Sequence, residues 1–223
     1  MSGESGNYDM ASFCQVLFRE YDIDLCVLLG MAAGRQGEVH LGDVVCATEV
    51  IDYGRTVRRP SGPQPNPKPF KPDRNVARQL NYFNPERRGW HVLLEARHRL
   101  AMSFSDAGLA PLPEVAPKDF RPAYSTGVIL AGDLMLEDDS LDEWARLLHA
   151  RKAKAAEMEG AGFATTCEDA DVSWMVMRGI ADFGGPERDK EWQLLATLSA
   201  AAALRVLLTE DYDLDAQADS DRF

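Results

Sequence analysis

Apolar residues form several short, nearly continuous runs along this chain. The runs at residues 23–29, 125–131 and 174–180 are bounded by glycine, acidic residues or polar turns, which is the pattern of buried strands. After Gly42 a further apolar stretch predicts a strand through about Val50. The sequence therefore predicts a sheet that is assembled from segments far apart in the chain.

Longer segments between these runs have apolar residues at helical spacing. Apolar residues three and four positions apart form one face of a helix. This pattern predicts amphipathic helices at residues 10–21, 90–104, 141–152 and 190–208, with a shorter helix after residue 160. Strands that alternate with helices are typical of layered α/β domains.

Residues 54–88 differ from the rest of the chain. They contain many prolines and have no apolar period, so we predict a long loop or lid. A solvated surface loop is the favoured interpretation. The alternative is that Arg58, Arg59, Lys68 or Lys71 contacts an anionic group such as a substrate phosphate.

Composition narrows the class of protein. The chain has 223 residues, is 45% hydrophobic and 27% charged, and carries a net charge of −12. This charge argues against nucleic-acid binding, which needs a basic surface. No apolar run approaches membrane length, and the first residues lack a signal-peptide pattern. Cysteines 14, 26, 46 and 167 are scattered, so we expect reduced thiols, a cytoplasmic protein, no metal and no membrane contact.

Two carboxylates stand where apolar runs meet small residues. Asp182 ends the run 174–180 in the sequence VMRGIADFGG, and Glu159 follows the shorter run 155–158 in AAEMEGAG. Ligands of open α/β sheets collect outside the carboxyl ends of the strands. Two acids at successive strand ends therefore predict a functional site.

These motifs, with three others in the same order, resemble the nucleoside phosphorylase and nucleosidase superfamily. The five segments are LLGMAAG at 28–34, LGDVV at 41–45, TGVILAGD at 126–133, AEMEG at 156–160 and RGIAD at 178–182. The resemblance implies an α/β fold with three αβα layers and a central mixed sheet. It also implies a purine nucleoside or nucleotide N-ribosyl hydrolase that releases the base and needs no cofactor.

The resemblance assigns roles to the two acids. Asp182 matches the acid that protonates N7 of the leaving purine, and it must hold a proton near neutral pH to do so. Glu159 matches the residue that accepts hydrogen bonds from the ribose 2′ and 3′ hydroxyls. An ionised carboxylate offers two acceptor oxygens, which suits that role.

Other positions match residues that line the family's pocket. Met158 is expected to pack on the sugar, and Met135 to stack on the base. Backbone groups of Met31, Ala32 and Ala33 are expected to line the side from which water or an anion attacks. Core packing is the alternative role for both Met158 and Met135.

Two departures from the family pattern bear on the reaction. Phosphorylases of this family commonly carry arginine and serine or threonine at the positions of Leu28 and Met31. Neither residue can bind a phosphate dianion, so hydrolysis is favoured, with a neighbouring subunit as the other possible source of phosphate ligands. Ala181 replaces the serine of the family's Ser-Asp pair.

The family's opening strands have no counterpart before Met10. We therefore expect an N-terminally incomplete domain at residues 1–209 and an acidic tail at 210–223. Because an uncovered strand edge invites pairing, we expect a homo-oligomer or a partner segment that completes the sheet. The alternatives to a hydrolase are a phosphate-dependent phosphorylase and an inactive nucleoside-binding module of a signalling or defence protein.

Overall fold

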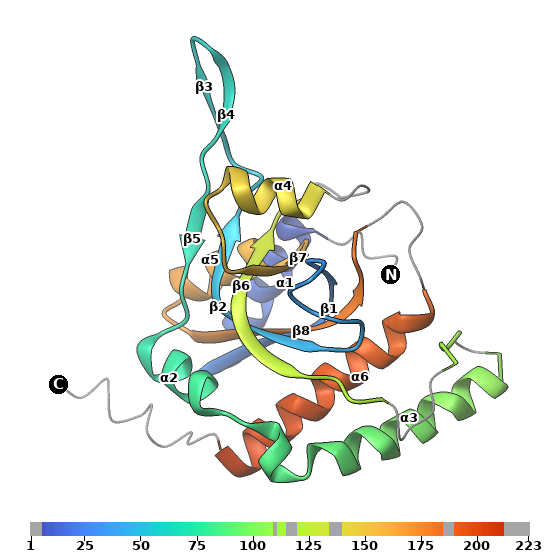
Figure 1. Ribbon diagram of the computed structural model, residues 1–223. Coiled ribbons are helices and arrows are strands. Elements are labelled where there is room, and N and C mark those ends of the chain that lie inside the picture. Colours follow the sequence, from blue (N-terminus) through green and yellow to red (C-terminus); the bar gives the residue numbers. More distant parts are fainter. Residues whose placement is uncertain (1–5, 109–110, 115–119, 134–139, 185–189, 212–223) are drawn as a thin grey trace.

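The computed structural model describes residues 6–108, 111–114, 120–133, 140–184 and 190–211. Within these ranges the chain forms a mixed sheet with helices packed on both faces (Figure 1). The predicted acidic tail and Met135 lie outside the described residues, except for the first two residues of the tail.

The main sheet has six strands in the order β5-β2-β6-β7-β1-β8. The pairs β2–β6, β6–β7 and β1–β8 are parallel, whereas β1–β7, β2–β5 and β2–β8 are antiparallel. Because β2 pairs with both β6 and β8, the sheet closes on itself. The strands are β1 (Leu25–Gly34), β2 (Val44–Asp52), β5 (Lys68–Phe70), β6 (Tyr124–Ala131), β7 (Ala153–Glu157) and β8 (Ser173–Asp182).

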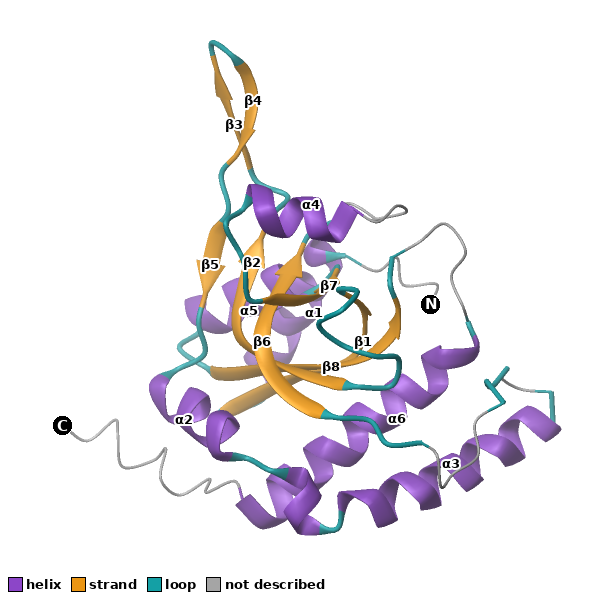
Figure 2. Cartoon of the chain, viewed as in Figure 1, coloured by secondary structure: helices purple, strands orange, loops and turns teal. Residues whose placement is uncertain are grey.

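Helices form a layer on each side of this sheet (Figure 2). On one side, α1 (Asn7–Glu20) and α5 (Gly160–Asp169) enclose a core cluster with Cys14, Phe163 and Trp174. The other side carries the second cluster and the helices α2 (Arg74–Tyr82), α3 (Trp90–Asp106) and α6 (Glu191–Val206). The remaining helical segments are η1 (Pro85–Arg88), α4 (Ser140–Leu147) and η2 (Leu207–Asp211). This is the predicted mixed α/β fold.

Helix α6 and its continuation, residues 191–209, are long and apolar enough to cross a membrane by length and composition alone. In this fold the segment is a core helix. Leu195, Ala196 and Ala200 are buried, and Gly179 of β8 meets the α6 backbone at Ala196. Its apolar character is therefore accounted for by packing on the sheet.

The first predicted strand differs from expectation in its position and its burial. The run 23–29 was expected to be buried on both faces, but β1 spans Leu25–Gly34 and is mostly half-buried. It pairs with β8 from Leu25 to Ala33 and with β7 only at Ala33 and Gly34. One edge of its first eight residues therefore has no strand beside it among the described residues.

The prediction of a long loop or lid at residues 54–88 was wrong. Strands β3 (Thr56–Arg59) and β4 (Gly62–Pro65) pair as a hairpin that projects from the body (Figure 1). Strand β5 then joins the main sheet, and α2 begins at the N-cap Asp73, whose carboxylate accepts from the backbone N–H groups of Asn75 and Val76. The many prolines suggested a loop. Proline is nevertheless tolerated in edge strands and before the start of a helix, which is where these prolines lie.

The contact between β8 and α6 gives a test of the fold. A Cβ atom on Gly179 would overlap the backbone carbonyl of Ala196, and backbone cannot move aside as a flexible side chain can. Gly179→Ala should therefore lower the free energy of unfolding by about 1–3 kcal/mol or more, measured by urea denaturation. Gly54→Ala is the matched control, since its Cβ would meet only Asp52 Oδ1 at 3.5 Å. Equal stability of the two variants would contradict this packing.

Candidate active site

A cavity of about 620 Å³ opens at the ends of β1, β7 and β8. The first turns of α1 and residues after β8 complete its wall. The polar side chains among the described lining residues are four carboxylates, one guanidinium and two hydroxyls: Asp9, Glu157, Glu159, Asp182, Arg178, Tyr53 and Thr197. The remainder of the wall is apolar or backbone.

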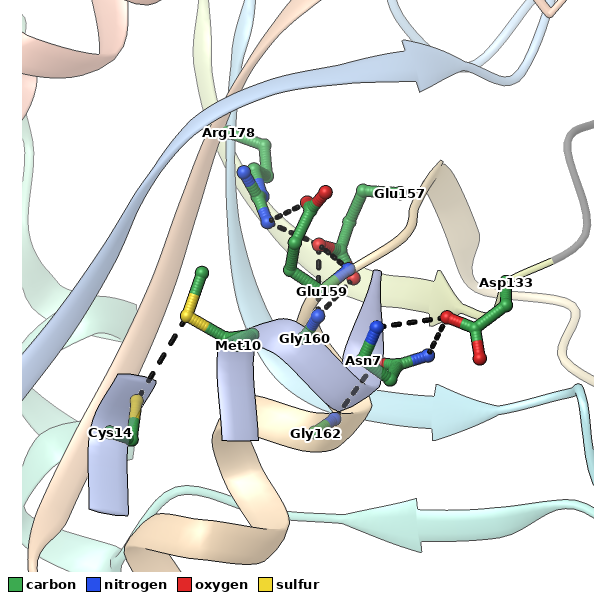
Figure 3. A network of polar contacts seen from close by, with 9 residues as sticks. All are labelled: Asn7, Met10, Cys14, Asp133, Glu157, Glu159, Gly160, Gly162 and Arg178. Atoms are coloured by element: carbon green, nitrogen blue, oxygen red, sulfur yellow. Dashed lines mark hydrogen bonds and ion pairs between the residues drawn. The ribbon is translucent and has the colours of Figure 1, made fainter. Parts of the chain in front are cut away.

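A buried ion-pair network lies at one side of this cavity (Figure 3). Arg178, in the middle of β8, donates through Nη2 to Glu157 and to Oε2 of Glu159, the latter at 3.0 Å. The side chains of Glu157 and Arg178 are 2% and 5% exposed, and that of Glu159 is 19% exposed. A charge this deeply buried is tolerated only when it is paired.

Backbone donors hold Glu157 in place. Its Oε1 accepts from the N–H of Gly160 at 2.8 Å, and its Oε2 accepts from the N–H of Glu159 at 3.0 Å. These donors lie at the start of α5, where helical N–H groups have no partner within the helix. Glu157 therefore joins the beginning of α5 to Arg178 of β8.

Two glycines leave the space that this network occupies. A Cβ on Gly30 of β1 would overlap Nη1 of Arg178, its neighbour across the sheet. A Cβ on Gly160 would lie 2.5 Å from Oε1 of Glu157. The first glycine of the LLGMAAG motif, Gly30, is thus explained by the guanidinium that lies against it.

Burial raises the pKa of Glu159. The adjacent Glu157 raises it further, whereas the Arg178 guanidinium acts in the opposite direction. Glu159 is also the residue immediately before α5, so its side chain is delivered to the cavity by the turn between β7 and that helix. Its carboxylate is therefore held by Arg178 and directed at the cavity.

Asp182 enters the cavity from the last position of β8. Its Oδ1 accepts from the N–H of Gly184 at 2.8 Å. Ala32 pairs with Ile180 and Ala33 with Asp182, so a bulge places Ala181 as an extra residue in β8. Bulges re-aim the side chains beside them, and this one immediately precedes the carboxylate.

Hydrogen bonds of Asn7 hold the first turn of α1 beside the start of α5 (Figure 3). The backbone N–H and Nδ2 of Asn7 both donate to Oδ1 of Asp133, at 2.8 and 3.1 Å. The side-chain Oδ1 of Asn7 accepts a hydrogen bond from the backbone N–H of Gly162 at 2.8 Å. A Cβ on Gly162 would overlap the backbone of Asn7, so α1 and α5 meet at a distance that only glycine permits.

The structure brings most of the predicted site residues together. Asp182, Glu159, Met158, Met31, Ala32 and Ala33 all line this one cavity. Ala32 is buried, whereas Met31 is 41% exposed. Met135 lies outside the described residues. Arg58, Arg59, Lys68 and Lys71 line neither this cavity nor its neighbour beside Asp133.

Sequence reasoning gave no role to Glu157 or Arg178. A signal was present, since each is a charged residue within or beside an apolar run, and such a residue must find a partner when the strand is buried. Their mutual pairing could not be predicted, because they are 21 positions apart in the sequence and the order of the strands was unknown.

The family follows from a comparison of the whole sequence. The family described as "Phosphorylase superfamily" matches residues 1–209. The chain belongs to this superfamily.

Two curated relatives carry nucleosidase names. The 5′-methylthioadenosine/S-adenosylhomocysteine nucleosidase of Mycobacterium tuberculosis is 30% identical over 186 residues, which are 82% of this chain and 68% of that protein. The "ATP nucleosidase Cap17" of Escherichia coli is 27% identical over 213 residues, or 93% of this chain. The chain spans only 39% of the length of Cap17.

Solved structures share the fold. The 5′-methylthioadenosine/S-adenosylhomocysteine nucleosidase of Neisseria meningitidis, in complex with methylthio-immucillin-A, has a TM-score of 0.64 at 21% identity, covering 92% of this chain and 77% of that chain. The corresponding nucleosidase of Colwellia psychrerythraea, in complex with adenine, has a TM-score of 0.66 at 18% identity, covering 93% and 75%. These structural similarities confirm the predicted mixed α/β fold, and the family match over residues 1–209 confirms the predicted superfamily.

Removing the central cation tests the ion-pair network. Arg178→Met leaves two carboxylates in the protein without their cation, and breaking a buried pair costs about 3–5 kcal/mol. Urea unfolding at pH 7 should show this loss. The loss should shrink as the pH falls toward the ordinary glutamate range near 4.3, because a protonated carboxyl can be buried without charge.

The exposed ion pair of α4 provides the control for that experiment. Arg146 donates to Asp142 at 3.2 Å, and the Arg146 side chain is 74% exposed. Exposed pairs contribute little to stability, so Arg146→Met should unfold like the unaltered chain. If Arg178→Met is no less stable than Arg146→Met at pH 7, the network does not hold the site together.

Proposed function

We propose that this chain hydrolyses the N-glycosidic bond of a purine nucleoside or nucleotide and releases the base. The observation that carries the proposal is the convergence of Asp182 and the Arg178-bound Glu159 on one cavity. Hydrolysis of this bond needs an acid for the leaving base and a group that holds the sugar. The nucleosidase names of the relatives support the same class of reaction.

In this mechanism Asp182 protonates N7 of the purine as the C1′–N9 bond breaks. Its Oδ1 is fixed by the Gly184 N–H, which orients the carboxyl group toward the base. The leaving base then departs as a neutral molecule, and this avoids a purine anion in an apolar cavity. General acid catalysis of this kind contributes roughly 10²–10⁴ to the rate.

Glu159 accepts hydrogen bonds from the ribose hydroxyls. Arg178 fixes this carboxylate through Oε2 and favours its charged form against the effect of burial. A charged acceptor makes stronger hydrogen bonds than a neutral one. Met158 packs on the sugar, and the backbone of Met31, Ala32 and Ala33 lines the side of attack.

Water is the nucleophile that suits this cavity. Arg178 is the only lysine or arginine among its described lining residues, and its positive charge is shared by two glutamates. A phosphate dianion needs cationic donors, whereas the cavity presents four carboxylates. Hydrolysis is therefore favoured over phosphorolysis.

The names of the relatives suggest candidate substrates. One relative is named for ATP, and the other for methylthioadenosine and adenosylhomocysteine. We accordingly propose an adenine-containing substrate. We also propose that the chain acts in the cytoplasm, in keeping with its four free cysteines, and as a homo-oligomer or with a segment that pairs along the open edge of β1.

Release of free adenine tests the proposed reaction. Adenosine, methylthioadenosine, adenosylhomocysteine and ATP are incubated with the chain, with and without inorganic phosphate, and adenine is measured by chromatography. A hydrolase releases adenine at the same rate in both conditions. Dependence on phosphate would indicate a phosphorylase, and binding without release would indicate an inactive binding module.

Replacing the proposed acid tests its role. Asp182→Asn preserves the shape of the side chain but removes the transferable proton, so kcat should fall roughly 10²- to 10⁴-fold. The measurement is adenine release under saturating substrate. Asp142→Asn is the control, because the Asp142 side chain is 48% exposed, pairs with Arg35 and is not among the residues that line the cavity. Unchanged kcat in Asp182→Asn would exclude Asp182 as the acid.

A further inference from the structure

Three cysteines from different elements meet in the core between the sheet and the helices α1 and α5. Cys14 belongs to α1, Cys26 to β1 and Cys167 to α5, and all three pack in the same apolar cluster. The side chains of Cys14 and Cys167 each form a hydrogen bond with that of Cys26. All three are free thiols, so Cys26 is the centre of a group of three reduced sulfur atoms.

The three sulfur atoms differ in their acidity. Hydrogen bonds from Cys14 and Cys167 lower the pKa of Cys26, whereas burial acts in the opposite direction. The hydrogen bond to Cys26, together with burial, raises the pKa of Cys14 and that of Cys167. Cys26 is therefore the member that loses its proton first. The thiolate, and not the thiol, is the nucleophile in cysteine chemistry.

Cys26 is also the member that solvent reaches most easily. It is half-buried, whereas Cys14 and Cys167 are 2% and 0% exposed. It lies in the part of β1 that has a strand on one side only among the described residues. An accessible cysteine with a low pKa beside a second cysteine is the arrangement that oxidants attack selectively.

Cys14 is better placed than Cys167 to form a disulfide with Cys26. Its hydrogen bond has the larger effect on the pKa of Cys26. A disulfide holds its sulfur atoms about 2.05 Å apart, so one of the two elements must shift when the bond forms. Helix α1 lies at the surface, with Phe13 and Val16 exposed, whereas most residues of α5 are buried. The surface helix can shift with less loss of packing.

We propose that these cysteines form a peroxide-sensitive site, in which oxidation joins Cys26 to Cys14 by a disulfide. The Cys26 thiolate attacks one oxygen of hydrogen peroxide, the O–O bond breaks, and the departing hydroxide takes up a proton to become water. Cys26 is then a sulfenic acid. The sulfur of Cys14 attacks the Cys26 sulfur, the S–O bond breaks, and the oxygen leaves as water with the Cys14 proton. The peroxide is reduced, and two thiols become one disulfide.

Loss of the thiolate in the first step prepares the second. The hydrogen bond to Cys26 is one of the interactions that raise the pKa of Cys14. That interaction ends when Cys26 becomes a sulfenic acid, so Cys14 can lose its proton more easily and attack. The order of the two steps therefore follows from the way the sulfur atoms are arranged.

The disulfide would lie directly behind the wall of the cavity. The thiol of Cys14 contacts the thioether sulfur of Met10 at 3.9 Å (Figure 3), and Met10 lines the cavity. Strand β1 contributes Leu28 and the residues after it to the same wall. Oxidation would thus join two elements of the cavity wall without altering Asp182 or Glu159. This proposal does not rest on the proposed function.

The test treats the unaltered chain with an equimolar amount of hydrogen peroxide at pH 7, then alkylates and digests it for mass spectrometry. Trypsin cleaves after Arg19, so Cys14 and Cys26 fall in separate peptides. We expect these peptides to be joined by a disulfide that dithiothreitol reverses. Dimedone, which captures sulfenic acids, should label Cys26 and not Cys14 when it is present during the oxidation. This labelling identifies the attacking sulfur without any variant.

Cys46→Ser is the matched control. Cys46 is fully buried, its thiol donates to the carbonyl of Val176, and burial raises its pKa to about 12. This variant should form the same disulfide as the unaltered chain, whereas Cys26→Ser should leave Cys14 and Cys167 reduced. Oxidation of Cys26 no faster than that of Cys46, or a disulfide between Cys26 and Cys167, would overturn the proposal.

Discussion

The structure of this site depends on one buried cation. Arg178 lies among the buried apolar residues of β8, and its pairing with Glu157 and Glu159 makes a charge tolerable at that position. Glu157 in turn accepts hydrogen bonds from the backbone N–H groups of Glu159 and Gly160 at the start of α5. The strand that ends in the proposed acid and the turn that carries the proposed sugar ligand are therefore fixed relative to each other by a single guanidinium.

The site also requires close approach between its structural elements, and glycines make that approach possible. Gly30 admits the guanidinium, Gly160 admits the Glu157 carboxylate, and Gly162 admits the backbone of α1. At Gly30 and Gly160 a Cβ would displace an atom of a side chain that lines the cavity, and at Gly162 it would displace the backbone of Asn7. Catalytic precision in such a site comes from groups that are positioned before the substrate arrives, and the glycines allow that positioning by letting three elements approach closely.

Much of the fold could be predicted from local pattern. The apolar run before Asp182 and the helical spacing of residues 190–208 correspond to β8 and α6. The strand ends also identified Glu159 and Asp182. Prediction failed where tertiary context decides: the β3–β4 hairpin among prolines, and the ion pair between Glu157 and Arg178.

Glu159, held by Arg178, is proposed to accept hydrogen bonds from the ribose 2′ and 3′ hydroxyls. Calorimetry with two matched ligands tests this role most directly. The ligands are an adenine-like C-nucleoside, whose glycosidic carbon–carbon bond cannot be hydrolysed, and its 2′-deoxy counterpart. A hydrogen bond to a charged group contributes about 1.5–3 kcal/mol, so the riboside should bind roughly 10- to 150-fold more tightly. Glu159→Gln should remove most of that difference. Equal affinities in the unaltered chain would contradict the account.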